Sequence, residues 1–549
     1  MWILYGGGKK QWTVLRHNGP FFPPEYESHN IPVIVNNQKI NLPILAEEYA
    51  TLYTRYIGTQ YTENPKFNKN FWNDFKKVLP KDLNINNLED IDFSLIKKHL
   101  EDIKEKNKNM SKEEKEKIKK KNAEIEEPYQ FCVIDGSTQK VGNFRIEPPG
   151  LFLGRGTHPK TGSIKRRIYP EDIIINLDKD APVPKPNIEE RKWKKVIHDR
   201  EVVWLASWKD TITGKTKYIF LSVESSFKSK SDEKKFDLAR RLKKNAKKIR
   251  EIYEKQLESE DLKEMQLATA LYFIDILALR VGGKKDKKEE ADTVGVTSLR
   301  VEHIDLIPSN VVKLDFLGKD SIRYCKRISI LKKVYENLEV LSRGKDKKEL
   351  LFDKINSNSL NEYLTSFLKN LTAKVWRTYN ASHLFQKELD KIRPEKIEKL
   401  PESERVNFII SLFQQANASV AILCNHQKTV STNFDKMVDR IKDRIKKLRA
   451  KKKKYNERIT KTKNKDVKKS YREKIEKLEA KIKLLKIKKE TKGKMKNVSL
   501  GTSKDNYIDP RIIFAFMKKF DIAGDKLGFS KSWLNRFTWA SEVDKNYRF

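Results

Sequence analysis

The sequence predicts an α+β protein of several domains that includes a protruding antiparallel hairpin of two basic helices. Its 549 residues are too many for a single hydrophobic core. Short alternating apolar segments, typical of strands, occur in the same chain as longer amphipathic segments, typical of helices. Between about 432 and 490 the composition changes to lysine with apolar residues at heptad spacing, which predicts two helices paired along an apolar seam.

The balance of charge points to a polyanionic partner. Lys and Arg number 116 against 76 Asp and Glu, which gives a net charge of +40. Such a charge favours nucleic acid, because neutralising phosphates releases condensed counterions. An anionic membrane is the competing partner, but the sequence contains no signal peptide, no lipidation motif and no apolar run of about 18 residues. We therefore expect nucleic acid and no membrane.

The cysteines and the missing motifs argue against several classes of site. Only Cys132, Cys325 and Cys424 are present, far apart, and neither C-x-x-C nor H-E-x-x-H occurs. This pattern indicates a reducing compartment and argues against a zinc site. No G-x-x-x-x-G-K-[ST] occurs either, so we expect no metal, no ATP and no other cofactor.

The N-terminal part predicts short strands with helices between them. We expect a helix at 45–56 and strands at 12–15, 203–208 and 217–221. Ser111 and Glu114 have the spacing of a capping box, which predicts a charged, solvated helix within the lysine-rich stretch 104–121.

A loop at 142–160 is rich in glycine and proline and carries Arg155 between two glycines. It does not match a dinucleotide-binding motif, because the third glycine is missing and His158-Pro159 breaks the helix that should follow. Its basic side chains suit contact with a nucleic-acid backbone or groove, and a solvated basic loop is the alternative. These side chains are Arg155, His158 and Lys160, together with Lys165, Arg166 and Arg167 just after the stretch.

The middle of the chain predicts a helical body interrupted by one β-hairpin. Helices are expected at 237–257, 262–279 and 406–423, and residues 357–380 are expected to be mostly helical. We expect Gly282-Gly283 to stop the second helix and to leave Arg280 at its C-terminal end. Alternating residues at 311–317 and 322–328 predict a hairpin with Lys319 at its tip, where a lysine is either solvated or inserted into a nucleic-acid groove.

Near the C-terminus, Tyr507 lies in a stretch of small and polar residues. Gly501 and Ser503 favour irregular backbone, and Pro510 is expected to open a helix that continues through Phe516. Tyr507 would then lie just before a helix N-terminus, which favours an anion such as phosphate. Our hypothesis is a nucleophilic phenol that attacks a phosphodiester, and the alternative is a packing tyrosine.

A set made of this phenol with cationic and imidazole side chains fits the chemistry of that hypothesis. Guanidinium and imidazole donors would stabilise the extra negative charge of a pentacoordinate phosphorus. The phenol has to lose its proton during attack, and the departing alkoxide needs one, for which a desolvated lysine is suited. The set consists of Tyr507, Arg280, Arg377, Lys319 and His426.

Over nearly its whole length the chain resembles eukaryotic-type DNA topoisomerase I, the type IB enzymes. The resemblance rests on long motifs in the same order as in that family. These motifs lie at 146–152, 169–176, 291–295, 315–324 and 421–427 and in the stretch around Tyr507.

The resemblance implies a role for each residue of the set. Arg280 and Arg377 would grip the scissile phosphate, Lys319 would be the general acid toward the 5′ oxygen, and His426 would bind a non-bridging oxygen. Tyr507 would form a covalent 3′-phosphotyrosine, and because one ester replaces another, neither ATP nor metal is required. The positions that would contact DNA near the cut are Arg155, Asp320, Lys374, Thr502 and Asn506.

The resemblance also implies a monomeric, two-lobed clamp that closes on duplex DNA in the nucleus, with a viral replication compartment as the alternative. Residues 1–225 would form the N-terminal lobe and 226–430 a mostly helical, tyrosine-recombinase-like catalytic lobe. Residues 431–492 would form a coiled-coil linker that slows rotation of the cut strand, and 493–549 the C-terminal domain that carries Tyr507.

Some positions depart from the family pattern. Val281-Gly282-Gly283-Lys284 stands where Ala-Gly-Asn-Glu is usual, and Asp505 replaces an apolar residue. Met1-Trp2 begins close to the core, so we expect any import signal to lie elsewhere, with 451–454 as a candidate. Two alternative functions are a tyrosine recombinase, which would carry His where Lys374 stands, and a non-catalytic DNA clamp.

Overall fold

The computed structural model describes residues 9–83, 85–398, 402–428, 430 and 433–549. It divides into two compact units. Unit 1 comprises Met1–Ser229 together with Lys285–Thr293, and unit 2 comprises Lys230–Lys284 together with Val294–Phe549. Helices and small sheets occur in both, which confirms the predicted mixed α/β class.

Unit 1 has two hydrophobic cores. The first lies around Trp12, Phe22 and Ile175 and is covered by two small sheets. One sheet is antiparallel, in the order β1 (Leu15–His17), β5 (Phe131–Ile134) and β6 (Ser137–Lys140). The other has the order β10 (Lys195–Ile197), β9 (Ile174–Asn176), β11 (Ala206–Lys209) and β12 (Thr216–Ile219), and only β10 and β9 are parallel.

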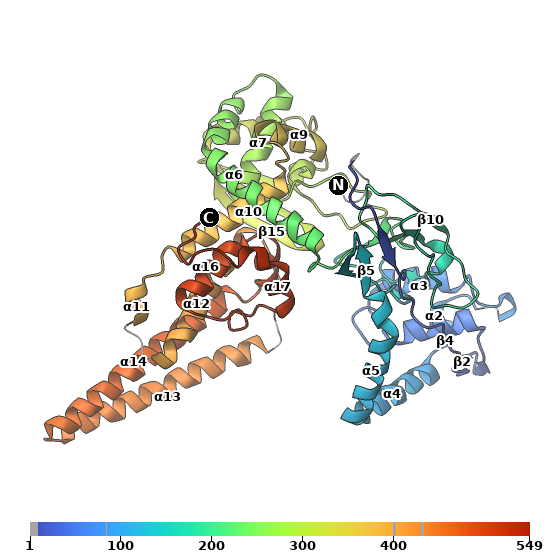
Figure 1. The fold of residues 1–549 in the computed structure, drawn as a ribbon, viewed down its shortest axis with the longest axis horizontal. Helices are drawn as coiled ribbons and strands as arrows, with labels where there is room; N and C mark the ends of the chain where they lie inside the picture. The colour runs from blue at the N-terminus through green and yellow to red at the C-terminus, as the bar shows by residue number, and fades with distance from the viewer. Residues whose placement is uncertain (1–8, 84, 399–401, 429, 431–432) are drawn as a thin grey trace. The chain divides into compact units, whose positions relative to one another are not determined.

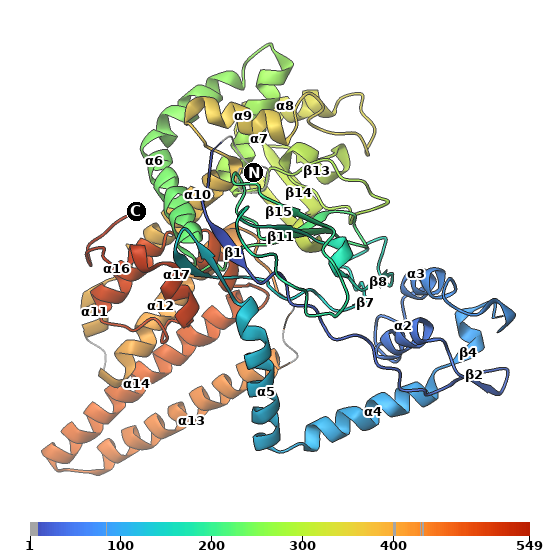
Figure 2. The ribbon, with the colours of Figure 1, turned by 45° about the vertical axis from the view of Figure 1, so that its right-hand side comes forward.

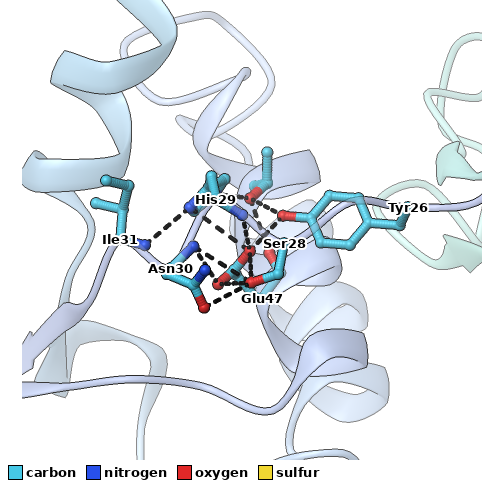
Figure 3. A network of polar contacts seen from close by, with 7 residues as sticks. Tyr26, Ser28, His29, Asn30, Ile31 and Glu47 are labelled. Carbon is cyan, nitrogen blue, oxygen red and sulfur yellow. Dashed lines mark hydrogen bonds and ion pairs between the residues drawn. The ribbon is translucent and has the colours of Figure 1, made fainter.

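The second core of unit 1 is aromatic. It includes Tyr53, Phe67 and Phe71, and the rings of Tyr53 and Phe71 stack at 4.3 Å. The elements around it are α2 (Ile44–Thr54), α3 (Pro65–Phe75), β2 (Val33–Val35), β3 (Gln38–Ile40), β4 (Ile91–Asp92), β7 (Gly150–Leu151) and β8 (Ile164–Lys165). Buried Glu47 of α2 accepts hydrogen bonds from Tyr26, Ser28 and the backbone of His29, which fastens the preceding loop to the helix (Figure 3).

Two largely exposed helices, α4 (Ser94–Asn109) and α5 (Lys112–Glu126), follow β4 in the chain. The predicted capping box between them is confirmed. Ser111 Oγ accepts from the Glu114 N–H at 3.1 Å, and Glu114 Oε2 accepts from the Ser111 N–H at 2.8 Å. Both backbone donors at the start of α5 are therefore satisfied by side chains.

Unit 2 is built around helices α7 and α10. Helix α7 is buried on nearly all sides and ends at Ala278, which adopts a left-handed conformation with φ of 50°. The prediction that Gly282-Gly283 would stop this helix was wrong, because it ends several residues earlier at that non-glycine cap. The longer helices of this unit as far as Leu423 are α6 (Ser226–Gln256), which begins within unit 1, α7 (Leu262–Leu277), α8 (Lys332–Ser342), α9 (Ser357–Phe367), α10 (Ala373–Leu389) and α12 (Glu402–Leu423).

The predicted β-hairpin is confirmed, and it belongs to a three-stranded antiparallel sheet. Strand β14 (Val311–Leu317) pairs with β15 (Arg323–Ser329) over their full length, and β13 (Ile304–Ile307) pairs with the other edge of β14. The inward side chains Phe316 and Tyr324 stack at 5.1 Å. This packing fixes the register of the hairpin and hence the position of its tip.

Helix α12 is the one segment of the described residues, at Glu404–Leu423, that by length and composition could cross a membrane. Its Phe413 is buried against Phe385 of α10 and Phe516 farther along the chain, at 5.4 and 5.2 Å between ring centroids. We therefore interpret α12 as a core helix.

Helices α13 (Phe434–Lys461) and α14 (Lys465–Lys494) coincide with the two heptad segments. Figures 1 and 2 show them, in orange, side by side along much of their length. Their seam contains Ile441, Ile445 and Ile482, and the rings of Tyr455 and Tyr471 lie 5.5 Å apart. Lysine surrounds an apolar seam, as the spacing predicts.

Around Tyr507 the structure corrects two predictions. Residues expected to be irregular form the short helix α15 (Gly501–Asn506), because contacts with the rest of unit 2 hold them, including a bond from Asn417 Nδ2 to Leu500 O of 3.1 Å. Helix α16 (Pro510–Phe520) begins where predicted, but Asp509 Oδ1 accepts from the Arg511 N–H at 3.0 Å. The N-terminus of α16 is thus occupied by its own carboxylate and is not open to a phosphate.

Candidate active site

Arg377, His426 and Tyr507 come from three distant segments of unit 2 and lie together. Arg377 Nη2 is 3.3 Å from His426 Nε2. The guanidinium carbon of Arg377 lies 5.0 Å from the centroid of the Tyr507 ring. The rings of His426 and Tyr507 stack at 5.5 Å with an angle of 28° between their planes. A phenol, a guanidinium and an imidazole are therefore grouped in one place.

Backbone carbonyls hold the guanidinium of Arg377. Its Nη1 donates to Ala278 O and its Nη2 to Cys424 O, and its side chain is almost fully buried. The left-handed conformation of Ala278 ends α7, and Cys424 follows the last residue of α12, so one side chain of α10 joins the ends of two other helices. Among the described residues, Arg377 Nε has no hydrogen-bond partner.

His426 is held on both sides of its ring. Its Nδ1 lies 2.8 Å from Ser503 Oγ, and both residues are buried. Burial, together with the charges of Arg377 and Arg280, lowers the pKa of His426 to about 3. The imidazole is therefore neutral at physiological pH, and the positive potential at this site comes from the two arginines.

Arg280 lies at a close approach of two backbone segments. Val296 N donates to Arg280 O at 2.9 Å, and a Cβ on Gly295 would lie 2.7 Å from that oxygen. Gly282, with φ of 83°, packs against the backbone of Gly295. Two glycines thus permit the crossing that fixes Arg280, and its charge is close enough to lower the pKa of His426.

The backbone of Tyr507 is attached to the helix that carries Arg377. Ser382 of α10 donates from its hydroxyl to Tyr507 O and accepts from the Asp509 N–H, each at 3.0 Å. Tyr507 itself is 5% exposed, so its ring is oriented by packing. Farther along, Arg511 forms a buried ion pair with Asp509 at 2.9 Å, which fixes the start of α16.

Lys319 is at the exposed tip of the hairpin, where Asp320 has a φ of 65°. Within the described residues, no hydrogen bond or ion pair joins Lys319 to Arg377, His426 or Tyr507. The hairpin is nevertheless attached next to His426, because Asn425 Nδ2 and Gln427 Nε2 donate to Arg323 O at 3.3 and 3.2 Å. The structure thus brings three of the five predicted residues into contact. Arg280 is close enough for its charge to lower the pKa of His426. Lys319, within the described residues, has no hydrogen bond or ion pair to the other three.

Comparison with protein-family models covers almost the entire chain. Residues 10–221 match the DNA binding fragment of eukaryotic DNA topoisomerase I, residues 224–459 match its catalytic core, and residues 479–549 match a C-terminal topoisomerase domain. The chain belongs to the eukaryotic DNA topoisomerase I family.

DNA topoisomerases 1 of distant eukaryotes are similar to this chain. DNA topoisomerase 1 beta of Arabidopsis thaliana is 41% identical over 99% of this chain and 60% of its own length. DNA topoisomerase 1 of Caenorhabditis elegans is 43% identical over 98% of this chain and 68% of its own length. DNA topoisomerase 1 of Homo sapiens is 41% identical over 98% of this chain and 72% of its own length. This chain therefore spans about 60% of the length of the Arabidopsis relative.

The residues that the topoisomerase resemblance assigns to DNA contact are all exposed. Lys374 lies on α10 one turn before Arg377, Thr502 and Asn506 lie on α15, and Asp320 lies at the hairpin tip. Arg155 is on an exposed loop of unit 1. Their contact with DNA stays a prediction.

The residues that hold the candidate site in place could not be identified from the sequence. Ser503 and Ser382 orient His426 and the backbone of Tyr507, and the carbonyls of Ala278 and Cys424 orient Arg377. Every residue has a backbone carbonyl, so the sequence does not indicate which carbonyl oxygens bind a side chain. A buried serine has no characteristic spacing either. Among the described residues, no group of three or more His, Cys, Asp or Glu side chains could hold a metal ion.

Proposed function

We propose that this chain is a type IB DNA topoisomerase, which relaxes supercoiled duplex DNA by cutting and resealing one strand without ATP or metal. Its membership of the eukaryotic topoisomerase I family supports this proposal. The observation that carries it is the contact of the Tyr507 ring with both the Arg377 guanidinium and the His426 imidazole.

In the proposed cleavage step the phenolic oxygen of Tyr507 attacks the scissile phosphorus. The bond from phosphorus to the 5′ oxygen breaks, and a 3′-phosphotyrosine and a free 5′-hydroxyl result. The phenolic proton passes to water as the new bond forms, and Arg377 and Arg280 stabilise the negative charge on the non-bridging oxygens. His426 stays neutral because burial lowers its pKa to about 3, so it acts as a hydrogen-bond donor and not as a cation.

Lys319 is proposed to give its proton to the departing 5′ oxygen. Its place on an exposed hairpin tip suits this role, because the tip can enter a DNA groove when the substrate binds. Religation is the reverse reaction, in which the 5′-hydroxyl attacks the phosphotyrosine and the phenol leaves. One phosphate ester is exchanged for another in each direction, so no external source of energy is needed.

The proposal extends to the predicted domains. Residues 1–225 and 226–430 would be the two lobes of a monomeric clamp around duplex DNA, and 493–549 would carry the nucleophile. Residues 431–492, which include the paired basic helices α13 and α14, would slow the rotation of the cut strand. A net charge of +40 provides the attraction for the DNA backbone, and the proposed compartment is the nucleus.

The test is relaxation of a supercoiled plasmid in EDTA without ATP. We expect wild-type protein to relax the plasmid and Tyr507→Phe to bind duplex DNA with nearly unchanged affinity but to relax nothing. The same substitution at Tyr471, on α14 away from this site, is the matched control and should leave relaxation intact. Peptide mapping of the trapped adduct should place the DNA on Tyr507, and a Tyr507→Phe protein that still relaxes the plasmid would refute the assignment.

A further inference from the structure

The two ring nitrogens of His426 have partners of different kinds. Nε2 faces Arg377 Nη2 at 3.3 Å, and Nδ1 faces Ser503 Oγ at 2.8 Å. A guanidinium can only donate hydrogen bonds, so Nε2 has to accept. In the neutral ring the proton is then on Nδ1, which donates to Ser503 Oγ.

The proposed reaction needs the other tautomer. A neutral imidazole donates to a phosphate oxygen only from the nitrogen that carries its proton, and Ser503 covers Nδ1. Nε2 is the nitrogen on the side of Arg377, so it has to be protonated in the complex with DNA. A second proton on the ring would satisfy this need, but burial and the charges of Arg377 and Arg280 oppose it.

We propose that Ser503 is a positioning residue that allows His426 to exchange tautomers when DNA binds. This inference rests on the proposed topoisomerase function. In the free protein Nδ1–H donates to Ser503 Oγ, whereas in the complex the Ser503 hydroxyl donates to Nδ1 and Nε2–H donates to a non-bridging oxygen. One proton leaves Nδ1 and one arrives at Nε2 by exchange with water, so the ring stays neutral throughout.

A hydroxyl is suited to this task because it both donates and accepts. A carboxylate or a carbonyl next to Nδ1 would accept only and would keep the proton on that nitrogen, whereas a backbone N–H would donate only. The serine hydroxyl preserves a hydrogen bond to the ring in both tautomers. The buried Nδ1 is therefore never left without a partner, an arrangement that would otherwise cost about 1–3 kcal/mol.

Ser503 also couples the ring to the nucleophile. Its carbonyl oxygen accepts the N–H groups of Tyr507 at 2.9 Å and of Ile508 at 3.0 Å, while its hydroxyl contacts His426. Ser503 has no exposed surface, so its side chain has little freedom to turn away. The imidazole and the phenol are thus held through a single residue of α15.

Nitrogen-15 NMR of histidine-labelled full-length protein tests the proposal, because protonated and unprotonated ring nitrogens have distinct shifts. The signal of His426 is assigned from its loss in His426→Gln. We expect a protonated Nδ1 in the free protein and a protonated Nε2 in a complex of the Tyr507→Phe variant with an unmodified duplex oligonucleotide. The same tautomer in both states, or a doubly protonated ring in the complex, would overturn the proposal.

Variants separate this role from a structural one. Ser503→Ala should slow single-turnover cleavage about tenfold with little change in the affinity for duplex DNA, and Ser503→Thr should restore the rate. Ser382→Ala removes another buried hydroxyl near Tyr507 and should leave the tautomers of His426 as in the wild type. If Ser503→Ala fails to fold, the spectra of protein with native Ser503 still show whether His426 changes its tautomer when DNA binds.

The outcomes also distinguish this proposal from the proposed function. A wild-type protein that relaxes plasmid but keeps the proton on Nδ1 in the complex would refute the role of Ser503 alone. A wild-type protein that fails to relax plasmid in EDTA would refute the proposed function, whichever tautomer the spectra show.

Discussion

The hydroxyl of Ser382 donates a hydrogen bond of 3.0 Å to the carbonyl oxygen of Tyr507. Ser382 lies on α10, five residues after Arg377, and it also accepts the Asp509 N–H. The helix that presents the guanidinium therefore also sets the backbone position of the phenol. A rigid helix fixes this distance better than two loops would, which suits a reaction that needs close alignment.

Ser382→Ala tests this coupling. The change removes both hydrogen bonds and leaves a buried N–H and a buried carbonyl without a partner, so we expect a loss of about 1–3 kcal/mol in the free energy of unfolding. We also expect about tenfold slower cleavage, because the phenol is less well placed. Denaturant unfolding and single-turnover cleavage measure the two effects. The control Ser366→Ala, which removes an exposed hydroxyl on α9, should change neither.

Lys319→Ala tests the proposed general acid. We expect cleavage of an ordinary duplex to slow about 100-fold or more, because the 5′ alkoxide has to leave without a proton. On a substrate with sulfur at the 5′ bridging position the slowing should be small, since a thiolate leaves without protonation. Rapid-quench kinetics on both substrates measure the difference, and equal slowing on the two would remove Lys319 from this role. Lys332→Ala, at the start of α8, should match wild type on both.

Elements that depend on local periodicity could be predicted from the sequence. The heptad spacing that includes Ile445 and Ile482 predicts the pair α13 and α14, and alternation around Lys319 predicts the β-hairpin. Where tertiary contacts determine the local conformation of the backbone, prediction from the sequence failed. Helix α15 was missed because Gly501 and Ser503 disfavour a helix by themselves, while bonds to other parts of unit 2 hold them in one.

In the candidate site, too, some residues could be predicted from the sequence and others could not. Arg377, His426 and Tyr507 were singled out by their chemistry and by the resemblance, and the structure places their side chains together. Their partners could not be predicted, because they are the Cys424 carbonyl and the Ser503 hydroxyl. Such groups become visible only when the backbone path is known.

The buried imidazole of His426 predicts a dependence of stability on pH. Burial lowers its pKa from 6.5 to about 3, so between these values the unfolded chain binds a proton that the folded protein does not. Stability should therefore fall as the pH decreases from 6.5, by up to about 1.4 kcal/mol per pH unit from this residue. His426→Gln removes this contribution.

Calorimetry of wild type and His426→Gln between pH 7.5 and about 5 checks this expectation. The variant loses the bond to Ser503, so it should be the less stable protein at pH 7.5, and the difference in melting temperature should shrink as the pH falls. A difference that stays constant over this range would show that His426 takes up its proton in the folded protein.

Lys374 provides a test of DNA contact close to the candidate site. It is exposed on α10 one turn before Arg377, so a duplex that reaches the guanidinium would pass near its ammonium group. We expect Lys374→Ala, in a Tyr507→Phe background, to weaken duplex binding and to reduce the slope of log affinity against log salt by about 0.9, because one fewer counterion is released. Fluorescence anisotropy at several salt concentrations measures the slope. Lys348→Ala removes another exposed charge, between α8 and α9, and an equal reduction there would mean that the effect reports net charge and not contact at the site.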